Sequence, residues 1–509
     1  MAGETLTSRS IPLAFKENSG GLNSEFGSLA LKPSEASDLD NIDFTRDGRF
    51  AQRNGYTRLN TTAFNSGATW TGLYWYEKKA TATNKLIGVA GDKLGKMDDL
   101  DGTWDDITGS LTLTAGNDNH VSWTTQIDVA VGTNNVNPPF RWDQTGNGTT
   151  LDVVAGLTQA KFVRTFANRL VLANVTISGT AHKSRFMWYP LDSLTSPSAS
   201  AFRDVNTNDG QEITGIEVLG EECIIFKDRS IWKAQNIGDP DLPFRFIKTR
   251  SHVGCVSGYS IQQSNNGLIF QSQDGWYFFD GNNSFKLSEK VTATIDTYND
   301  NRFPQTQSVL YQKNNLYIAS VTNSGGSTHD RNLTFNDLNG AWSKYSGLNA
   351  NAFARVYDNN EEKIFFGDYS GFVYQFDVGD NDNPGGTETA IDAFYYTAWL
   401  NFDDIVNVKG IPHIYIFHKI SESTLSFSYS YDFDESDAFT QTFTLSGGGA
   451  IYGTAVFGTD VYGVSGGKVQ RRDLSDRGRV VRLKFANNNV DETFEIEGFG
   501  ALPHLETFQ

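Results

Sequence analysis

The chain has 509 residues, of which 13% are aromatic, 20% are charged and 49 are glycine, and its formal net charge is −18. That charge argues against a protein that binds DNA or RNA tightly, because such binding depends on lysine and arginine side chains that neutralise phosphates. The length predicts two or more domains, and the aromatic-rich, glycine-rich composition is typical of short strands joined by tight turns.

The first 60 residues contain short motifs at residues 20–23, 41–44, 47–49 and 53–56, but no sustained apolar pattern. We therefore expect an N-terminal arm over residues 1–60, with one strand pair and no core of its own. The beginning of the sequence has neither a basic nor an apolar targeting region, and no apolar run approaches the length that spans a membrane. We expect a protein without a membrane-spanning segment that is made and assembled in a cytoplasm.

Seven short apolar runs recur across residues 61–378, and their starts lie about 40 to 55 residues apart. They occupy residues 86–89, 127–131, 170–172, 223–226, 268–270, 316–318 and 364–366. Most are followed by a polar turn and a second run with an aromatic residue, which is typical of a β-hairpin. Six tryptophans follow these runs, namely Trp104, Trp142, Trp188, Trp232, Trp276 and Trp342.

This interval is the period of a propeller blade of about four strands. We predict an all-β fold in which residues 61–378 form a β-propeller of about seven blades. Residues 379–386 are rich in glycine, asparagine and aspartate, so we expect a linker there. Alternation of apolar and polar residues returns at 425–431 and 481–485 without the repeat interval, so residues 387–509 are expected to form a separate antiparallel β domain, resembling a sandwich.

Patterns that suggest catalysis have a simpler explanation in each case. Residues 463–467 satisfy the G-x-S-x-G pattern of a nucleophile elbow, but both flanks are strand-like, so a hairpin turn is expected. Residues 272–276 resemble a shortened Asp-box, but an Asp-Gly turn of an ordinary β-hairpin is expected there as well. The seven histidines show no metal-binding or catalytic spacing. We expect no catalytic residue, no cofactor and no enzyme activity.

Two acidic clusters are weak candidates for calcium binding. One contains Asp380, Asp382 and Asn383, and the other contains Asp432, Asp434 and Asp437. The first has Pro384 at the next ligand position and the second has no glycine for the tight turn, so ordinary solvated loops are favoured and no metal site is expected. Two cysteines, Cys223 and Cys255, are expected to be reduced and buried, because disulfide-built proteins are far richer in cysteine.

Several motifs, in their order along the chain, resemble the pattern of the tail-hub proteins of short-tailed bacteriophages, also called the nozzle or packaged-DNA stabilisation proteins. They are Gly-Gly-Leu-Asn at 20–23, Leu-x-Asn-Ile-Asp-Phe at 39–44, Asp-Gly-Arg at 47–49, the segment 53–56, and the segments 166–170, 222–232, 274–281 and 494–499. The resemblance covers most of the chain as scattered short motifs.

The resemblance implies a structural protein of the virion, located in the phage tail and built on a β-propeller. Its copies would form a ring, taken as a hexamer, below the portal and its adaptor proteins. Such a ring extends the DNA channel, helps to retain the packaged genome and docks tail fibres or spikes. The acidic charge is compatible with a lumen through which genomic DNA passes without sequence-specific binding.

An alternative is a carbohydrate-binding or glycan-cleaving β-propeller protein. A secreted protein of that kind is expected to show a signal segment, and cleavage of a glycan requires two carboxylates across the bond. The 60 acidic residues offer many such pairs, and nothing in the sequence selects one.

A basic stretch stands out near the C-terminus against the acidic background. It contains Lys468, Arg471, Arg472, Arg477, Arg479, Arg482 and Lys484. Arg482 and Lys484 alternate with apolar residues, which predicts a basic ribbon on one face of a strand. We consider Arg479, Arg482 and Lys484 as a docking surface for an acidic neighbour, in a ring the next copy of the chain. The other interpretation is a solvated sheet face that discourages edge pairing.

Overall fold

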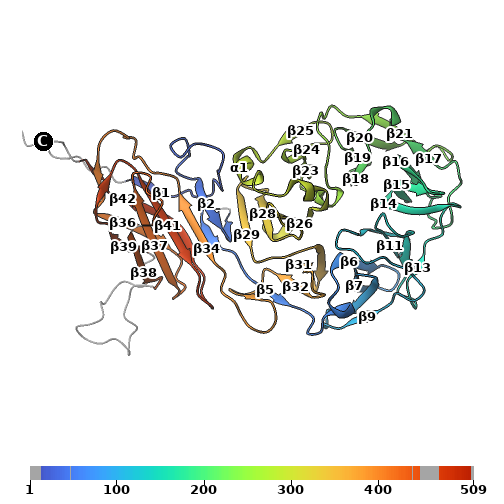
Figure 1. Ribbon diagram of the computed structural model, residues 1–509, viewed down its shortest axis with the longest axis horizontal. Coiled ribbons are helices and arrows are strands. Elements are labelled where there is room, and N and C mark those ends of the chain that lie inside the picture. Colours follow the sequence, from blue (N-terminus) through green and yellow to red (C-terminus); the bar gives the residue numbers. More distant parts are fainter. Residues whose placement is uncertain (1–12, 46, 438, 447–468, 506–509) are drawn as a thin grey trace, which may run out of the picture.

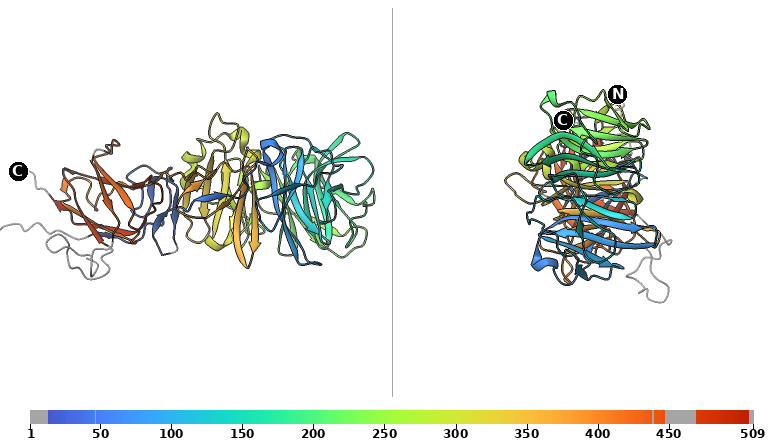
Figure 2. Two further views of the ribbon diagram at one scale, coloured as in Figure 1. Left: turned by 90° about the horizontal axis from the view of Figure 1, so that it is seen from below. Right: turned by 90° about the vertical axis from the view of Figure 1, so that its right-hand side faces the viewer.

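The computed structural model describes residues 13–45, 47–437, 439–446 and 469–505. Figure 1 shows an elongated molecule in which a β-propeller lies beside a second β domain, and Figure 2 shows the two domains end to end from another side. Within the described residues the helices are short: α1 (Thr292–Ile295) and six 3-10 turns, η1 (Phe64–Gly67), η2 (Thr207–Asp209), η3 (Gly258–Ser260), η4 (Glu289–Val291), η5 (Asp300–Gln305) and η6 (Gln312–Asn314). None of these helices is long and apolar enough to cross a bilayer.

The propeller has seven sheets, and in each of the first six the four antiparallel strands follow chain order. Blade 1 contains β6 (Trp70–Lys78), β7 (Thr83–Ala90), β8 (Lys93–Asp98) and β9 (Trp104–Asp106). Blade 2 contains β10 (Ser122–Gln126), β11 (Val129–Thr133), β12 (Phe140–Trp142) and β13 (Thr149–Thr150), and blade 3 contains β14 (Leu157–Phe166), β15 (Arg169–Ile177), β16 (Thr180–Trp188) and β17 (Phe202–Asp204).

Blade 4 contains β18 (Ile213–Leu219), β19 (Glu222–Lys227), β20 (Ile231–Asn236) and β21 (Phe244–Lys248). Blade 5 contains β22 (Gln262–Gln263), β23 (Leu268–Ser272), β24 (Gly275–Phe279) and β25 (Ser284–Lys286), and blade 6 contains β26 (Gln307–Tyr311), β27 (Leu316–Val321), β28 (Arg331–Asn336) and β29 (Trp342–Ser346). Neighbouring blades touch through their first strands, for example β10 with β14 and β30 with β6, so these strands lie nearest the axis.

The seventh blade is completed by a strand from the N-terminal segment. Its own strands are β30 (Ala352–Asp358), β31 (Glu361–Gly367) and β32 (Val373–Phe376), and β5 (Tyr56–Arg58) pairs antiparallel with β32. The two ends of the propeller are therefore joined by hydrogen bonds between β5 and β32. A fifth strand, β33 (Asp382–Asn383), pairs in parallel with β5.

Six of the seven apolar runs lie within second strands, and the run 127–131 enters the second strand β11 from the turn before it, which confirms the predicted propeller. A second strand is apolar on both sides because neighbouring blades cover both faces of its sheet. Every residue of β23 and β27, for example, is buried. The tryptophans are less regular: four lie in third strands, whereas Trp104 and Trp342 lie in fourth strands.

The second domain is a sandwich of two main sheets. One has the order β3-β4-β42-β36-β39, with β1 also paired to β42, and the other has the order β2-β34-β41-β37-β38. Their strands are β1 (Leu13–Phe15), β2 (Ala36–Asp40), β3 (Ile42–Phe44), β4 (Phe50–Gln52), β34 (Ala393–Thr397), β36 (His413–His418), β37 (Thr424–Tyr431), β38 (Phe439–Thr444), β39 (Val469–Asp473), β41 (Val481–Asn487) and β42 (Glu495–Ala501). A small sheet joins β35 (Lys409–Gly410) to β40 (Arg477–Gly478) and β43 (His504–Leu505).

The N-terminal segment therefore differs from the expected arm. The expected strand pair is present as β3 and β4, but β1 to β4 belong to the sandwich and β5 to the propeller. The reason is that this segment buries its few apolar side chains against the C-terminal strands. The Phe50 ring, for example, stacks on Tyr395 with ring centroids 4.0 Å apart.

The expected linker at residues 379–386 is also part of the folded structure. Asp382 and Asn383 form β33, and the Asp382 side chain is buried against Arg53. The turn-forming residues of this segment did not predict strand β33. The strand has only two residues and no apolar alternation, and it is stabilised by an ion pair with a residue distant in the sequence. Asn381 and Asp382 are therefore buried, unlike the solvated loop that the sequence suggested, whereas Asp380 is exposed as expected.

Candidate functional site

The structure places the basic residues of the C-terminal stretch on three sheets, with Arg477 in β40 of the small sheet. In β41, Val481, Leu483 and Phe485 are buried and face the sandwich core, while Arg482 and Lys484 lie half-buried on the outer face, as the alternation predicts. Arg479 precedes β41 in a turn. Arg471 and Arg472 lie in β39 of the opposite sheet, and Lys468 and the 463–467 motif lie outside the described residues.

The charge of Lys484 is neutralised within the sandwich. Its Nζ lies 2.8 Å from Oδ2 of Asp437, and the Tyr396 hydroxyl donates a hydrogen bond of 2.6 Å to the same oxygen. Burial lowers the pKa of Lys484, but the hydrogen bonds with Asp437 and Tyr396 outweigh burial and raise it. Lys484 is therefore a charged member of a local cluster.

Arg479 stabilises a surface turn through contacts with Asp432 and Lys409. Its backbone N–H donates to Oδ1 of Asp432 at 2.6 Å, and its Nη1 lies 3.9 Å from Oδ2 of the same carboxylate. Its carbonyl oxygen accepts a hydrogen bond from Lys409 Nζ at 2.8 Å. Exposed ion pairs of this kind contribute only about 0 to 1 kcal/mol.

Unlike Lys484 and Arg479, which contact carboxylates, Arg482 has its guanidinium group positioned by aromatic rings. The Cζ atom lies 4.6 Å from the ring centroid of Tyr396 and 4.8 Å from that of Trp399. No ion pair joins it to a carboxylate of the described residues, but its charge adds to the hydrogen bonds from Ser436 that lower the pKa of Asp434. Stacking on aromatic rings orients a guanidinium without consuming its N–H donors, so these donors remain available for a carboxylate or a phosphate.

Arg482 lines a groove of about 580 Å³ between the sandwich and blade 6. Blade 6 contributes Arg331 and Lys344, and the sandwich contributes Tyr396, Trp399 and Arg482. Lys344 is paired with Asp38 at 2.7 Å, whereas the Nη1 of Arg331 donates to the backbone oxygen of Asp330 at 3.1 Å. The groove thus presents two guanidinium groups, from different domains, to one space that the carboxylates of Asp38 and Glu435 also line.

The acidic clusters named as calcium candidates have structural partners instead. Asp434 accepts a hydrogen bond from the Ser436 backbone, and Asp432 and Asp437 hold Arg479 and Lys484 as described above. Across the described ranges no group of three His, Cys, Asp or Glu side chains could hold a metal ion. Residues 272–276 form the hairpin between β23 and β24, as expected.

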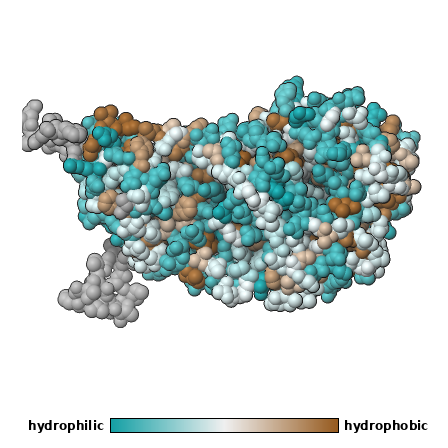
Figure 3. Space-filling view, in the orientation of Figure 1, coloured by the Kyte–Doolittle hydropathy of each residue, from teal (hydrophilic) through white to brown (hydrophobic). Residues whose placement is uncertain are grey.

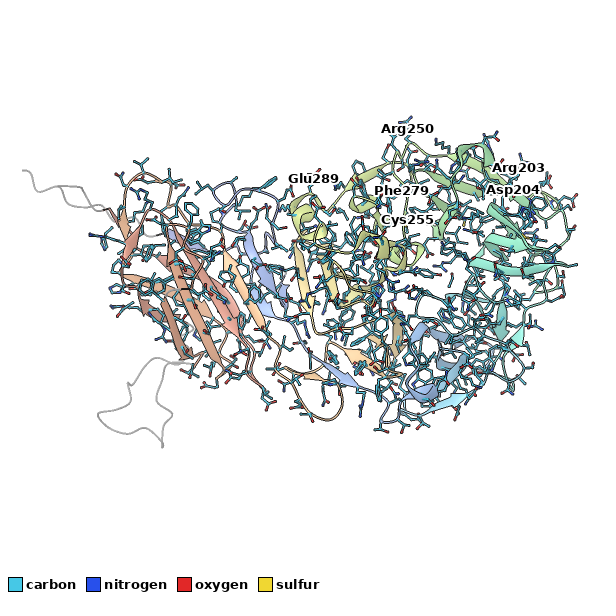
Figure 4. The ribbon with its side chains drawn as sticks, viewed as in Figure 1. Arg203, Asp204, Arg250, Cys255, Phe279 and Glu289 are labelled. Carbon is cyan, nitrogen blue, oxygen red and sulfur yellow. The ribbon has the colours of Figure 1, made fainter. Side chains whose placement is uncertain are left out.

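Both cysteines are free thiols in the propeller interior, as expected. Cys223 and Cys255 are completely buried, and Cys255 lies inside the ring of blades (Figure 4). Burial raises the pKa of both thiols, that of Cys255 to about 12, so neither thiolate forms at neutral pH.

The sequence did not reveal a cluster that closes one end of the propeller axis. The Tyr259 hydroxyl of blade 5 donates to the backbone oxygen of His120, beside blade 2, at 2.9 Å, and the His120 and His329 rings lie 6.4 Å apart. Arg302 forms two hydrogen bonds of 2.7 Å with Asp118. These contacts join residues beside blade 2 to residues of blades 5 and 6, which are not its neighbours in the ring. The contacts therefore cross the propeller axis, and their side chains fill it at this end.

The comparisons with known proteins returned solved structures alone, all at low sequence identity. No family model matches the chain, and no curated protein matches it. Among solved structures, the β-propeller domain of Myceliophteria thermophila Cps50 (Swd1) is 10% identical, with 64% of this chain and 99% of that chain covered and a TM-score of 0.40. The WD40 β-propeller domain of Doa1 is 9% identical, with 64% and 97% covered and a TM-score of 0.39, and the computationally designed protein Ika8 is 10% identical, with 63% and 100% covered and a TM-score of 0.37.

Proposed function

We propose that the protein is a structural subunit of a short-tailed phage tail, a tail hub or nozzle whose copies form a ring, taken as a hexamer, below the portal and adaptor proteins. In this role the protein extends the DNA channel, helps to retain the packaged genome and docks fibres or spikes. The role is structural and involves no catalysis.

The observation that carries this proposal is the position of the motifs on which the resemblance depends. Those of the N-terminal segment lie where the propeller meets the sandwich. The backbone N–H of Leu22 donates to the carbonyl of Trp342 in blade 6 at 2.8 Å, and a Cβ on Gly21 would lie 2.5 Å from the Trp342 nitrogen. Arg53 connects the same segment to Asp382. These residues fix two domains as one elongated body, which suits a subunit that must keep its shape within a ring.

The closed propeller axis limits where DNA can pass in this proposal. Because side chains of several blades meet across the axis at one end, the channel is formed between copies and not through a propeller. The net charge of −18 favours a lumen that DNA slides past without binding tightly.

The groove at Arg482 supports a contact between copies. The chain carries 60 acidic residues against 42 basic ones, so a second copy has abundant carboxylates for the two guanidinium groups. Most of the face shown in Figure 3 is hydrophilic, with hydrophobic residues concentrated over the outer part of the sandwich. A polar, charge-complementary contact between copies is consistent with that surface.

The proposal can be tested in phage particles. If a phage encodes this chain, its peptides should be found in purified virions, and an antibody against the propeller should label the tail below the portal by electron microscopy. Absence of the chain from purified, infectious virions that contain the portal and adaptor would refute the proposal.

A further inference from the structure

The open end of the propeller axis has the features of a ligand site. A cavity of about 770 Å³ lies there, and residues from all seven blades line it. Small-molecule sites usually occupy roughly 300 to 1,000 Å³, so the cavity has room for a ligand of a few rings. This end lies opposite the closed end, since its residues come from the ends of the first strands and the closing residues lie near their beginnings.

One wall of the cavity is aromatic. Trp75 comes from β6, and Phe353 and Tyr357 come from β30, the neighbouring innermost strand. Trp75 is half-buried and Tyr357 is 40% exposed. The Trp75 ring is held by its Nε1, which donates to Oε1 of Glu77 at 3.1 Å, and Arg355 lies over the Tyr357 ring with 5.3 Å between Cζ and the ring centroid. The rings are therefore positioned before any ligand arrives.

Glutamine side chains from blades 5 and 6 form another part of the wall. The Gln262 Nε2 donates to the backbone oxygen of Ser308 at 2.9 Å, which leaves its amide oxygen directed elsewhere, while Gln263 is exposed. Gln312 receives a hydrogen bond of 3.4 Å from the Tyr357 hydroxyl. Amides both donate and accept hydrogen bonds, so this side suits hydroxyl groups.

The charges that line the cavity balance, since the three cations Lys79, Arg164 and Arg355 face the three carboxylates Glu77, Asp128 and Glu217. Arg164 Nε lies 3.0 Å from Oε2 of Glu217, and Arg355 Nε lies 3.7 Å from Oε1 of Glu362. The Asp128 carboxylate accepts the backbone N–H groups of Lys79 and Ala80 at 3.1 and 2.8 Å. Because the three cations and three carboxylates of the lining balance, the cavity has no net charge with which to attract an anion.

We propose that the open end of the axis binds a neutral oligosaccharide. A sugar ring has an apolar C–H face, which would lie on Trp75 and Tyr357, and a rim of hydroxyl groups, which would hydrogen-bond to Gln263 and Gln312. A strongly charged ligand would gain little from this lining, because its positive and negative charges balance. The inference is independent of the proposed hub role, since it concerns a different surface.

The test uses the full chain and a panel of neutral and charged probes: maltohexaose, cellohexaose, chitohexaose, a heparin hexasaccharide and a library of unmodified peptides. Isothermal titration should detect at least one neutral hexasaccharide. Trp75→Ala should weaken that affinity at least tenfold, and Gln263→Ala, at an exposed position that cannot disturb the fold, should weaken it measurably. Phe285→Ala is the matched control, because Phe285 is 54% exposed on β25 outside the cavity.

The inference is wrong if no neutral probe binds at millimolar concentration, or if only heparin or peptides bind. It is also wrong if Trp75→Ala and Gln263→Ala bind a neutral probe as the unmodified chain does. None of these outcomes bears on ring assembly, which is measured separately.

Discussion

Arg53 and Asp382, 329 residues apart in the sequence, form a buried bidentate ion pair, with Nη1 to Oδ1 at 2.8 Å and Nη2 to Oδ2 at 2.7 Å. The remaining guanidinium donors bond to Asn41 Oδ1, the Asn54 carbonyl and the Ser346 carbonyl of blade 6. All five donors of one arginine are thus used to connect the N-terminal segment, blade 6 and the strand that follows blade 7.

Loss of this arginine should destabilise the protein strongly. We expect Arg53→Met to lower the free energy of unfolding by about 3 to 5 kcal/mol, because it leaves the buried Asp382 carboxylate without a partner. Lys313→Met is the control: Lys313 and Glu361 form an exposed pair at 3.3 Å, so its loss should cost about 0 to 1 kcal/mol. Urea denaturation followed by tryptophan fluorescence measures both, and equal effects would show that the buried pair has no special role.

Gly21 should tolerate no side chain. Its φ is +76°, and a Cβ would lie 2.5 Å from the backbone nitrogen of Trp342. Gly325 has a similar φ of +78° but open space around it, so Gly325→Ala measures the backbone strain alone, roughly 1 kcal/mol. We expect Gly21→Ala to lower the thermal unfolding midpoint clearly more than Gly325→Ala and to increase proteolysis between the two domains. Equal midpoints would mean that the contact with blade 6 is loose.

Acid should weaken the propeller through its axial histidines. Burial lowers the pKa of His120 to about 4 and that of His329 to about 3, while Asp118 raises both and Arg302 lowers both. The unfolded chain binds these protons below about pH 6.5 and the folded chain does not, so stability falls as the pH drops from about 6.5 towards the folded values. One shifted pKa unit corresponds to about 1.4 kcal/mol, so His120 alone accounts for roughly 3 kcal/mol.

His120→Phe should remove that part of the pH dependence. Asp43, whose pKa burial raises to about 6, acts in the opposite direction, but it is present in both proteins and cancels in the comparison. Thermal midpoints between pH 7 and pH 4 should fall less for His120→Phe than for the unmodified chain. Parallel curves would show that His120 takes up its proton without unfolding.

The parts of the fold that could be predicted from the sequence are those that depend on interactions between residues close together in the chain. The seven second strands were predicted because both faces of each are buried, which leaves a local apolar run such as residues 223–226. The partners of β2 and β5 were not predicted, because β2 pairs with β34 and β5 with β32, more than 300 residues away, and no local pattern specifies such a partner.

The candidate site was predictable in the same limited way. The alternation in residues 481–485 placed Arg482 and Lys484 on the outer face of a strand. It did not reveal that Asp437 neutralises Lys484, nor that Tyr396, Trp399 and Arg331 surround the groove, because these residues come from other strands and from another domain. The axial histidines carried no spacing signal, since they meet only across the closed ring of blades.

Charge reversal in the groove should affect assembly and leave folding intact. We expect Arg482→Glu to reduce the assembled fraction at least tenfold at physiological salt, because it replaces a guanidinium donor with a charge that repels acidic neighbours. Arg203→Glu, at an exposed position of blade 3 (Figure 4), makes the same charge change far from the sandwich and should assemble normally. Equal assembly of both variants, measured by analytical ultracentrifugation, would exclude the groove as the contact between copies.

The most direct test of the account is the mass of the purified full chain, alone and after mixing with the portal–adaptor complex, measured by native mass spectrometry. One chain has a mass of 56.3 kDa. The account predicts a species that contains several copies, taken as six, and that forms or persists on the adaptor. A single copy of 56.3 kDa at every concentration, with and without the adaptor, would contradict it.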